Sequence, residues 1–326
     1  MDVPTIPWSK LLSGLIGSFI VLGCVAATKA QATAPPTLCY AFLKGNAYQA
    51  SDLYVTCGAQ DERITKLGDI WDFAVATDGS VLALRRQRGT EKGKDGYGRP
   101  TDIPHFEMEV ISLKPGFERH WSPVDGDASL YPYCGSILAI AQEVHVASEK
   151  PAYETYRTDN VLTGKPVTLP PYVAFGCSSD GKTVVGYLEG DRRALWAGLP
   201  PRRRIAREET QYSIVTYGVS PDGQYVAYTT LQSLCADKNG ENLGCVRGSS
   251  AKISVSDRGG VLYDSGTGET CAGWECTGVF YWPAGTTEAK PIEPVGWRAQ
   301  WITPEVAAAL RAWRSHEYAP NGKSRN

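Results

Sequence analysis

Short apolar segments, each directly after a polar turn, recur along most of the chain. The clearest copy is the Ser-Pro-Asp-Gly turn at residues 220–223, which leads into an alternating apolar segment at 224–230. Related copies with the proline replaced occupy residues 178–187 and 76–84. Asp can accept hydrogen bonds from its own turn backbone, and Gly adopts a positive φ angle without steric cost. The pattern therefore predicts β-hairpins that repeat along the chain.

The spacing of these segments indicates the architecture. Apolar strands begin near residues 39, 81, 137, 184 and 225, at intervals of about 40–55 residues, and a second pair of strands follows each of them. A sixth, less regular set spans residues 252–292. Units of four short strands at this period are typical of propeller blades, which bury their apolar faces against one another. We predict an all-β fold over residues 38–300: a β-propeller, with six blades of four antiparallel strands favoured over five or seven blades.

The last part of the chain, residues 301–326, has a different pattern. Thr303 is an N-cap residue, Pro304 suits the first helical position, and Glu305 suits the positive end of a helix. Apolar residues follow at helical spacing, namely Val306, Leu310 and Trp313. We expect a short C-terminal helix packed across the closure of the ring, with docking of a partner as the alternative role.

The turn Ser220-Pro221-Asp222-Gly223 and its weaker copies resemble the repeats of the TolB-like propellers, which include the periplasmic propeller of the Tol–Pal system. The resemblance implies a six-bladed ring. It covers most of residues 38–295, but only the first strand pair of each blade is specific. The separate N-terminal domain of TolB has no room before the first blade, and fold alone does not determine function.

The N-terminus is typical of an export signal. Lys10 precedes an apolar stretch at residues 11–27, and Ala30-Gln-Ala32 forms a small-residue cleavage motif. We therefore interpret residues 1–30 as the signal and residues 31–37 as a flexible tether. Alternatively, Val-Leu-Gly-Cys24 resembles the lipobox of bacterial lipoproteins, in which case Cys24 is lipidated. The protein is predicted to be periplasmic or secreted, with a membrane-anchored lipoprotein as the alternative.

Eight cysteines remain outside the predicted signal. An even number in an exported chain suggests disulfides, although spacing alone leaves the connectivity open. Pairing between sequence neighbours is favoured most for Cys235–Cys245 and Cys271–Cys276. The remaining candidates, paired in the same way, are Cys39, Cys57, Cys134 and Cys177.

Charge and motifs exclude several functions. A formal net charge of −2 and a pI of about 6.1 argue against a nucleic-acid-binding protein, which usually carries a basic domain. The sequence has no Gly-x-Ser-x-Gly, no phosphate-binding P-loop and no His-Glu-x-x-His motif. The four histidines lack the spacing of metal ligands. We therefore predict no cofactor, no metal and no nucleic-acid partner, and a membrane contact only through an N-terminal lipid.

The candidate binding residues are basic or aromatic. Residues 85–104 read as a Gly-rich loop inserted between two strands, and loops often carry specificity. Charge runs are usually solvated surface, but this one is also suited to an anionic partner. Two tryptophans assigned to loops are suited to stack on sugars or peptides, one of them inside the expected Cys271–Cys276 loop. The candidates are Arg85, Arg86, Arg88, Arg99, Trp121 and Trp274.

The functional hypothesis follows from a clear repeat architecture without a catalytic motif. We predict a binding or scaffold propeller for an envelope protein or glycan, without chemistry of its own. The alternative is a glycan-active enzyme, a lyase or hydrolase, with its site at the mouth of the propeller channel. Such a site needs ionisable side chains from several blades to converge, which is a property of the structure.

Overall fold

The structure is a computed structural model that divides into residues 1–36 and residues 37–326. It describes residues 38–45, 51–58, 60–94, 98–124, 128–135, 137–145, 154–188, 191–207, 214–230, 232–248, 252–264 and 278–318. The export signal, the tether and Cys24 lie outside these residues. Within them, no helix has both the length and the apolar character needed to span a membrane.

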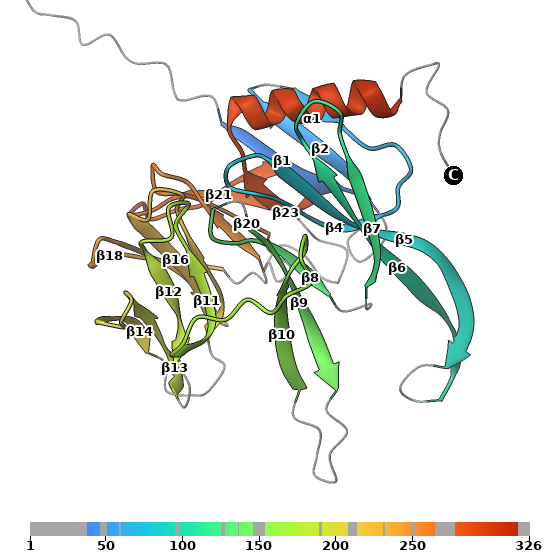
Figure 1. Cartoon of the computed structure of the whole chain (residues 1–326). Coiled ribbons are helices and arrows are strands. Elements are labelled where there is room, and N and C mark those ends of the chain that lie inside the picture. Colours follow the sequence, from blue (N-terminus) through green and yellow to red (C-terminus); the bar gives the residue numbers. More distant parts are fainter. Residues whose placement is uncertain are drawn as a thin grey trace, which may run out of the picture. The chain divides into compact units, whose positions relative to one another are not determined.

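The described strands form six antiparallel sheets, which we number as blades 1–6 (Figure 1). Blade 1 has the order β23 (Gly296–Trp301), β1 (Cys39–Lys44), β2 (Asp52–Cys57) and β3 (Asp61–Arg63). Blade 2 contains β4 (Ile70–Val75), β5 (Val81–Lys94), β6 (Pro100–Ser112) and β7 (Arg119–Val124). Blade 3 contains β8 (Ser129–Pro132), β9 (Leu138–His145) and β10 (Glu154–Asn160), and a bridge from Asp159 to Pro166 lies at the position of its fourth strand.

The remaining sheets follow the same order from the innermost strand outward. Blade 4 contains β11 (Tyr172–Cys177), β12 (Val184–Leu188), β13 (Asp191–Ala197) and β14 (Arg203–Arg207). Blade 5 contains β15 (Ile214–Val219), β16 (Tyr225–Thr230), β17 (Ser233–Lys238) and β18 (Glu241–Arg247). Blade 6 contains β19 (Ile253–Val255), β20 (Gly260–Asp264), β21 (Val279–Pro283) and β22 (Lys290–Glu293). The prediction of a six-bladed β-propeller is confirmed.

The repeated Asp-Gly turn joins the first and second strands of a blade. In blade 5, the Ser220 hydroxyl donates to Asp222 Oδ1 at 2.6 Å, and the same oxygen accepts from the Gln224 backbone N–H at 3.0 Å. Gly223 follows at φ +75°, a conformation that favours glycine. The turn at Ser178 in blade 4 repeats these bonds, with Ser178 donating to Asp180 at 2.7 Å. Local side-chain chemistry therefore accounts for the motif.

The same turns also connect neighbouring blades. The Ser179 N–H donates to the Pro221 carbonyl at 2.8 Å, which joins blade 4 to blade 5. The Asp222 N–H donates to Asp257 Oδ1 at 2.7 Å, which joins blade 5 to blade 6. On the other side, the Thr77 hydroxyl of blade 2 donates to the Gly135 carbonyl of blade 3 at 2.5 Å. The turns thus form a series of polar contacts between blades.

Substitutions at Gly181 and Gly223 can distinguish the local role of the turn from its contact with the neighbouring blade. A Cβ atom at Gly223 would collide with the Thr183 side chain of blade 4, whereas one at Gly181 would meet no atom within 4 Å. Both have nearly the same φ, +75° and +72°. We expect Gly181→Ala to lower the free energy of unfolding by about 1 kcal/mol, and Gly223→Ala by about 2–3 kcal/mol, because overpacking is added to the backbone strain.

The measurement is equilibrium denaturation in urea, with Gly181→Ala as the matched control for backbone strain. Equal losses for both variants would show that the contact between blades 4 and 5 at this turn contributes nothing.

The final strand closes the ring. β23 pairs with β1, with Tyr40 opposite Trp301 and Leu43 opposite Trp297. Blade 1 is therefore built from both ends of the described chain, and its innermost strand is the last strand in the sequence. The sequence analysis ended the strand pattern at residue 292 and missed this strand.

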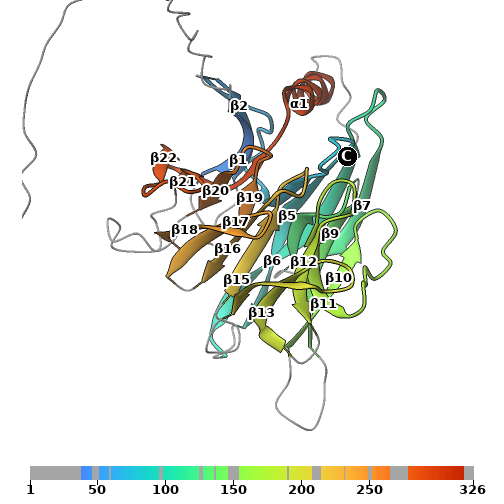
Figure 2. The same cartoon turned by 90° about the vertical axis from the view of Figure 1, so that its left-hand side faces the viewer.

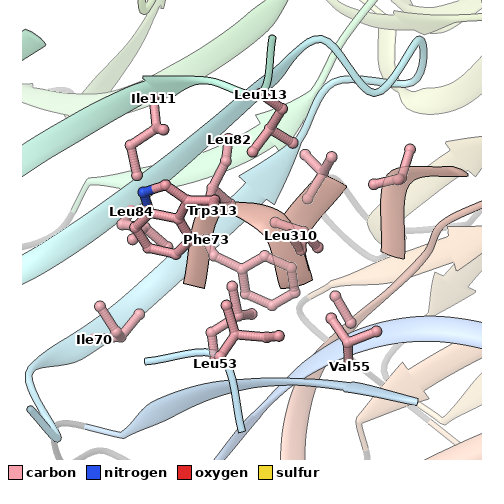
Figure 3. Close-up of a cluster of buried hydrophobic side chains, with 14 of the residues drawn as sticks. Leu53, Val55, Ile70, Phe73, Leu82, Leu84, Ile111, Leu113, Leu310 and Trp313 are labelled. Atoms are coloured by element: carbon pink, nitrogen blue, oxygen red, sulfur yellow. The ribbon is translucent and has the colours of Figure 1, made fainter. Parts of the chain in front are cut away.

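The helix α1 (Pro304–Glu317) packs into the core between blades 1 and 2. The Thr303 hydroxyl accepts from the Val306 N–H at 3.3 Å, and Pro304 stands in the first turn, which confirms the predicted C-terminal helix. Figure 2 shows α1 end-on, with β1 and β2 on one side and blade 2 on the other. In Figure 3, Leu310 and Trp313 lie among the apolar side chains of both blades, including Leu53, Val55, Ile70, Phe73, Leu82, Leu84 and Ile111.

Three disulfides join strands or blades. The Cys39–Cys57 bond links β1 to β2, and the Cys235–Cys245 bond links β17 to β18. The Cys134–Cys177 bond joins blade 3 to blade 4. These three predicted pairs are confirmed, and they indicate an oxidising, exported environment. Cys271 and Cys276 lie outside the described residues.

Candidate functional site

Blade 2 carries a two-stranded extension that is longer than the one formed by β9 and β10 in blade 3. β5 and β6 pair continuously, apart from one bulge, from Val81 opposite Ser112 to Lys94 opposite Pro100. β4 pairs with β5 only as far as Arg86, and β7 pairs with β6 only as far as Phe106. Residues 89–94 and 100–105, which we call the ribbon, therefore pair only with each other among the described strands. Figure 1 shows β5 and β6 curving away together from the rest of blade 2.

The prediction of a loop over residues 85–104 is wrong, because most of this segment is β-strand. Two of the four glycines that suggested a loop, at positions 89 and 93, lie within the ribbon. A Cβ atom at Gly93 would overlap the Ile103 side chain, which lies across the strand pair from it. Glycine here makes room for a cross-strand apolar side chain, a use that sequence alone does not separate from a turn.

Proline blocks one edge of the ribbon. Pro100 and Pro104 of β6 have no N–H to donate, yet the ladder runs unbroken past both of them. Both prolines must therefore occupy the positions whose backbone groups face away from β5. Asp102 lies two residues from each proline, so its backbone groups also face away from β5. Of the three positions on the β6 edge that face outward, the two prolines therefore have no N–H to donate.

The opposite edge of the ribbon is open. Three residues of β5 lie opposite these positions, namely Lys94, Lys92 and Thr90. The N–H and C=O groups of these three residues therefore face away from β6. All three residues carry a backbone N–H, and no described strand pairs with this edge. The β5 edge is thus able to accept another strand, while the β6 edge is protected against it.

Arg85 and Arg86 do not lie on the ribbon. Arg86 is 4% exposed and pairs with Glu109 and Asp69, at 2.6 Å to each carboxylate. Arg85 is also buried, and it donates from Nη1 to the Ala128 carbonyl at 2.5 Å. The expectation that these arginines sit on an exposed insertion is wrong, because their carboxylate and carbonyl partners come from distant parts of the sequence.

Arg88 and Trp121 lie together at the base of the ribbon. The Arg88 guanidinium carbon is 4.0 Å from the centre of the Trp121 ring, and its Nε donates to Glu107 at 3.0 Å. Trp121 is 43% exposed and belongs to strand β7 instead of the predicted loop. Arg99 is exposed next to the start of β6, and Trp274 lies outside the described residues. Of the predicted binding residues, the structure brings Arg88 and Trp121 into contact.

A second group of side chains converges from the innermost strands. Asp72 of β4 pairs with Lys252, directly before β19, at 2.9 Å, and with Arg298 of β23 at 3.3 Å. These residues come from blades 2, 6 and 1, and the sequence analysis did not identify them. Asp72 and Lys252 are fully or almost fully buried. Ionisable side chains from three blades therefore converge here.

Asp72 nevertheless has few ways to act in proton transfer. Its Oδ1 accepts from Lys252 and from the Phe73 N–H at 2.8 Å, and its Oδ2 accepts from Arg298 and from the Leu130 N–H at 2.8 Å. These four bonds saturate a carboxylate. Burial alone would raise the pKa of Asp72, but the charges of Arg298 and Lys252 outweigh it and lower that pKa. Asp72 is thus a fixed anion that joins blades.

Aromatic side chains lie on the innermost strands of the other three blades. The Lys252 ammonium lies 5.7 Å from the centre of the Tyr131 ring on β8. Phe175 of β11 packs against Tyr133, with ring centres 4.8 Å apart. Tyr217 of β15 contacts Tyr187 at 5.3 Å, and its burial, together with the neighbouring tyrosines, raises its pKa well above the ordinary value. The innermost strands therefore carry a charged cluster in blades 1, 2 and 6 and aromatic side chains in blades 3, 4 and 5.

Comparison with known proteins identifies no family for this chain. No protein-family model matches the chain, and no curated protein is similar to it. Among solved structures, the β-propeller domain of Myceliophteria thermophila Cps50 (Swd1) is similar with a TM-score of 0.41 and 10% identity, over 70% of this chain and 87% of that one. A putative 6-phosphogluconolactonase from Bacteroides uniformis is similar with a TM-score of 0.44 and 10% identity, over 82% of this chain and 100% of that one. The resemblance to TolB-like propellers rests on the repeated turns.

Proposed function

We propose that this protein is an exported binding propeller that captures an extended segment of an envelope protein along the β5 edge of the ribbon. The observation that carries the proposal is the asymmetry of the ribbon, with prolines on one edge and backbone donors on the other. Extended peptides bind open sheet edges through main-chain hydrogen bonds, and neighbouring side chains supply specificity. Arg88 and the exposed Trp121 supply such side chains at the base of the ribbon.

The proposal also states that the protein is exported and that it binds its partner without catalysing a reaction. The three disulfides support an oxidising compartment, reached through the signal at residues 1–30, with acylation of Cys24 as the alternative anchor. The saturated hydrogen bonding of Asp72 supports a binding role over the glycan lyase or hydrolase alternative. A glycan partner in place of a protein is an outcome that the experiment below distinguishes.

A matched pair of proline substitutions tests the proposal. Lys92 and Asp102 face each other in the ribbon, and both have their backbone groups directed outward. Lys92→Pro removes a donor from the open edge, whereas Asp102→Pro adds a third proline to the blocked edge; both break the same ion pair. We expect Lys92→Pro to reduce partner recovery at least ~10-fold, and Asp102→Pro to leave it near the wild-type level.

The measurement is a crosslinking pull-down from the native envelope, with the partner identified by mass spectrometry and the fold of each variant checked by circular dichroism. Equal recovery with both variants would refute strand addition at β5. If wild-type protein recovers no protein but retains envelope glycan, the protein-binding proposal fails and the glycan role replaces it.

A further inference from the structure

The two faces of the ribbon carry different side chains beside its open edge. Side chains alternate along a strand, so residues 90, 92 and 94 of β5 point to one face and residues 89, 91 and 93 point to the other. We call the first the lysine face and the second the glycine face; each also includes the residues of β6 that lie directly opposite. A strand that pairs with the open edge places its own side chains alternately on these two faces. Each face therefore selects a different set of partner residues.

The lysine face carries an excess of positive charge. Lys92 pairs with Asp102 at 2.7 Å, and its side chain is still 89% exposed. Lys94 is also exposed, and it lies opposite Pro100, which has no charge. Two ammonium groups and one carboxylate therefore lie on this face among the described residues of the ribbon. Opposite charges on neighbouring strands stabilise a sheet, so this face favours an added strand with acidic side chains.

The glycine face offers space and an apolar contact. Gly89 and Gly93 place no side chain beside the open edge, and a Cβ atom at Gly89 would meet no atom within 4 Å. A Cβ atom at Gly93 would overlap Ile103 Cδ1, so the Ile103 side chain extends from β6 over β5 toward the open edge. Ile103 is 38% exposed. A large apolar side chain on the added strand would cover Ile103 and occupy the space beside the glycines.

A second copy of this chain does not meet these requirements. The antiparallel register that pairs residues 90, 92 and 94 of two copies places their Lys92 side chains directly opposite each other. Like charges in opposite positions destabilise strand pairing, and edge lysines are a common protection against association of identical chains. The side chains at this edge therefore favour a chain of different sequence.

We propose that the partner segment is an extended acidic peptide in which acidic side chains alternate with large apolar or aromatic ones. Its acidic side chains lie on the lysine face beside Lys92 and Lys94, and its apolar side chains lie on the glycine face against Ile103. An uncharged residue lies opposite Glu91, which already pairs with His105 at 3.3 Å. This inference rests on the proposed strand addition at β5 and adds the chemical class of the partner.

Four synthetic peptides test the two faces separately. The probe is Glu-Phe-Glu-Thr-Glu-Phe-Glu, which reads the same in both directions and so suits an antiparallel or a parallel added strand. The lysine peptide has lysine in place of every glutamate, and the threonine peptide has threonine in place of both phenylalanines. The reordered peptide, Phe-Glu-Glu-Thr-Glu-Glu-Phe, keeps the composition of the probe but not its alternation. Each peptide carries fluorescein, and its binding to the full-length protein is measured by fluorescence anisotropy.

We expect the probe to bind, with the lysine peptide at least ~10-fold weaker and the threonine and reordered peptides each at least ~3-fold weaker. Equal affinity for the probe and the lysine peptide would overturn the acidic requirement. Equal affinity for the probe and the reordered peptide would show attraction by net charge alone and would overturn the alternation. No binding of the probe at about 1 mM would overturn the inference as a whole, since even weak specific binding is detected at that concentration.

Lys94→Glu tests the charged contact. We expect this variant to bind the probe at least ~10-fold more weakly than the wild type and to bind the lysine peptide more tightly, because the charge beside the open edge is reversed. Lys114→Glu is the matched control, because Lys114 is exposed in the turn that follows the other end of β6. We expect the control to leave both affinities unchanged. Wild-type affinity for both peptides in Lys94→Glu would contradict the inference.

Ile103→Thr tests the apolar contact and keeps a β-branched side chain in the strand. We expect it to weaken the probe at least ~3-fold, because less apolar surface is covered, and to leave the threonine peptide unchanged. An unchanged affinity for the probe would overturn the apolar half of the inference.

The outcomes distinguish this inference from the proposed function. The pull-down with Lys92→Pro and Asp102→Pro tests strand addition whatever the sequence of the partner. If only Lys92→Pro loses the partner, while the probe and the lysine peptide bind equally, strand addition stands and the acidic partner is refuted. If both variants recover the partner equally, strand addition is refuted, and this inference fails with it.

Discussion

Replacement of Trp313 by alanine is expected to lower the free energy of unfolding by about 3–5 kcal/mol. Trp313 is fully buried in the core that α1 forms with blades 1 and 2. Its removal leaves a cavity where the two sheets and the helix meet, and close-packed interiors relax only partly around such a cavity. The measurement is equilibrium unfolding in guanidinium chloride, followed by circular dichroism.

Trp313→Phe is the matched control. The Trp313 indole N–H has no hydrogen-bond partner among the described residues, so phenylalanine removes no hydrogen bond there. We expect this variant to lose less than about 2 kcal/mol, from reduced packing alone. If Trp313→Ala lost as little as Trp313→Phe, the helix would be an appendage of the ring and not part of its core.

Asp72→Asn is the second substitution with a large expected effect, again a loss of about 3–5 kcal/mol in the free energy of unfolding. The asparagine would leave the buried Lys252 ammonium and the Arg298 guanidinium without their carboxylate. An uncompensated charge in the interior costs far more than a surface ion pair contributes. The measurement is urea denaturation near neutral pH.

A double variant and the pH dependence check the cause. Asp72→Asn combined with Lys252→Met should recover much of the loss, since the unpaired ammonium is gone; simple addition of the two losses would refute the charge argument. The pKa of Asp72 is lowered in the folded protein. Its contribution is therefore complete above the unfolded pKa of about 4 and disappears as the pH falls through the folded value. Asp72→Asn should lack this acid-dependent loss.

The repeated architecture was predictable because its signal is local. Each Asp-Gly turn is specified by the hydrogen bonds of its own side chains and by the positive φ of its glycine. The helix start was predictable for the same reason, from Thr303 and Pro304. The strand β23 escaped detection because no such turn follows it: in blade 1 the innermost strand and its neighbour β1 come from distant parts of the chain.

The site residues were harder to predict because their partners are distant in sequence. Asp72 and Lys252 meet across 180 residues, and nothing in the sequence near either of them indicates the other. Arg86 looked like an exposed cation in a basic segment because Glu109, its partner, lies on the next strand. Arg88 and Trp121, by contrast, were identified by type, and the fold brings them together.

The position of β23 also sets the order in which the protein can mature. The ribosome adds residues 296–301 after all the other described strands, yet they form the innermost strand of the first blade. Until they arrive, the edge of β1 has no neighbour, and unpaired edges promote association between chains. A nascent chain that ends before β23 thus has an unpaired β1 edge, and the addition of β23 closes the ring.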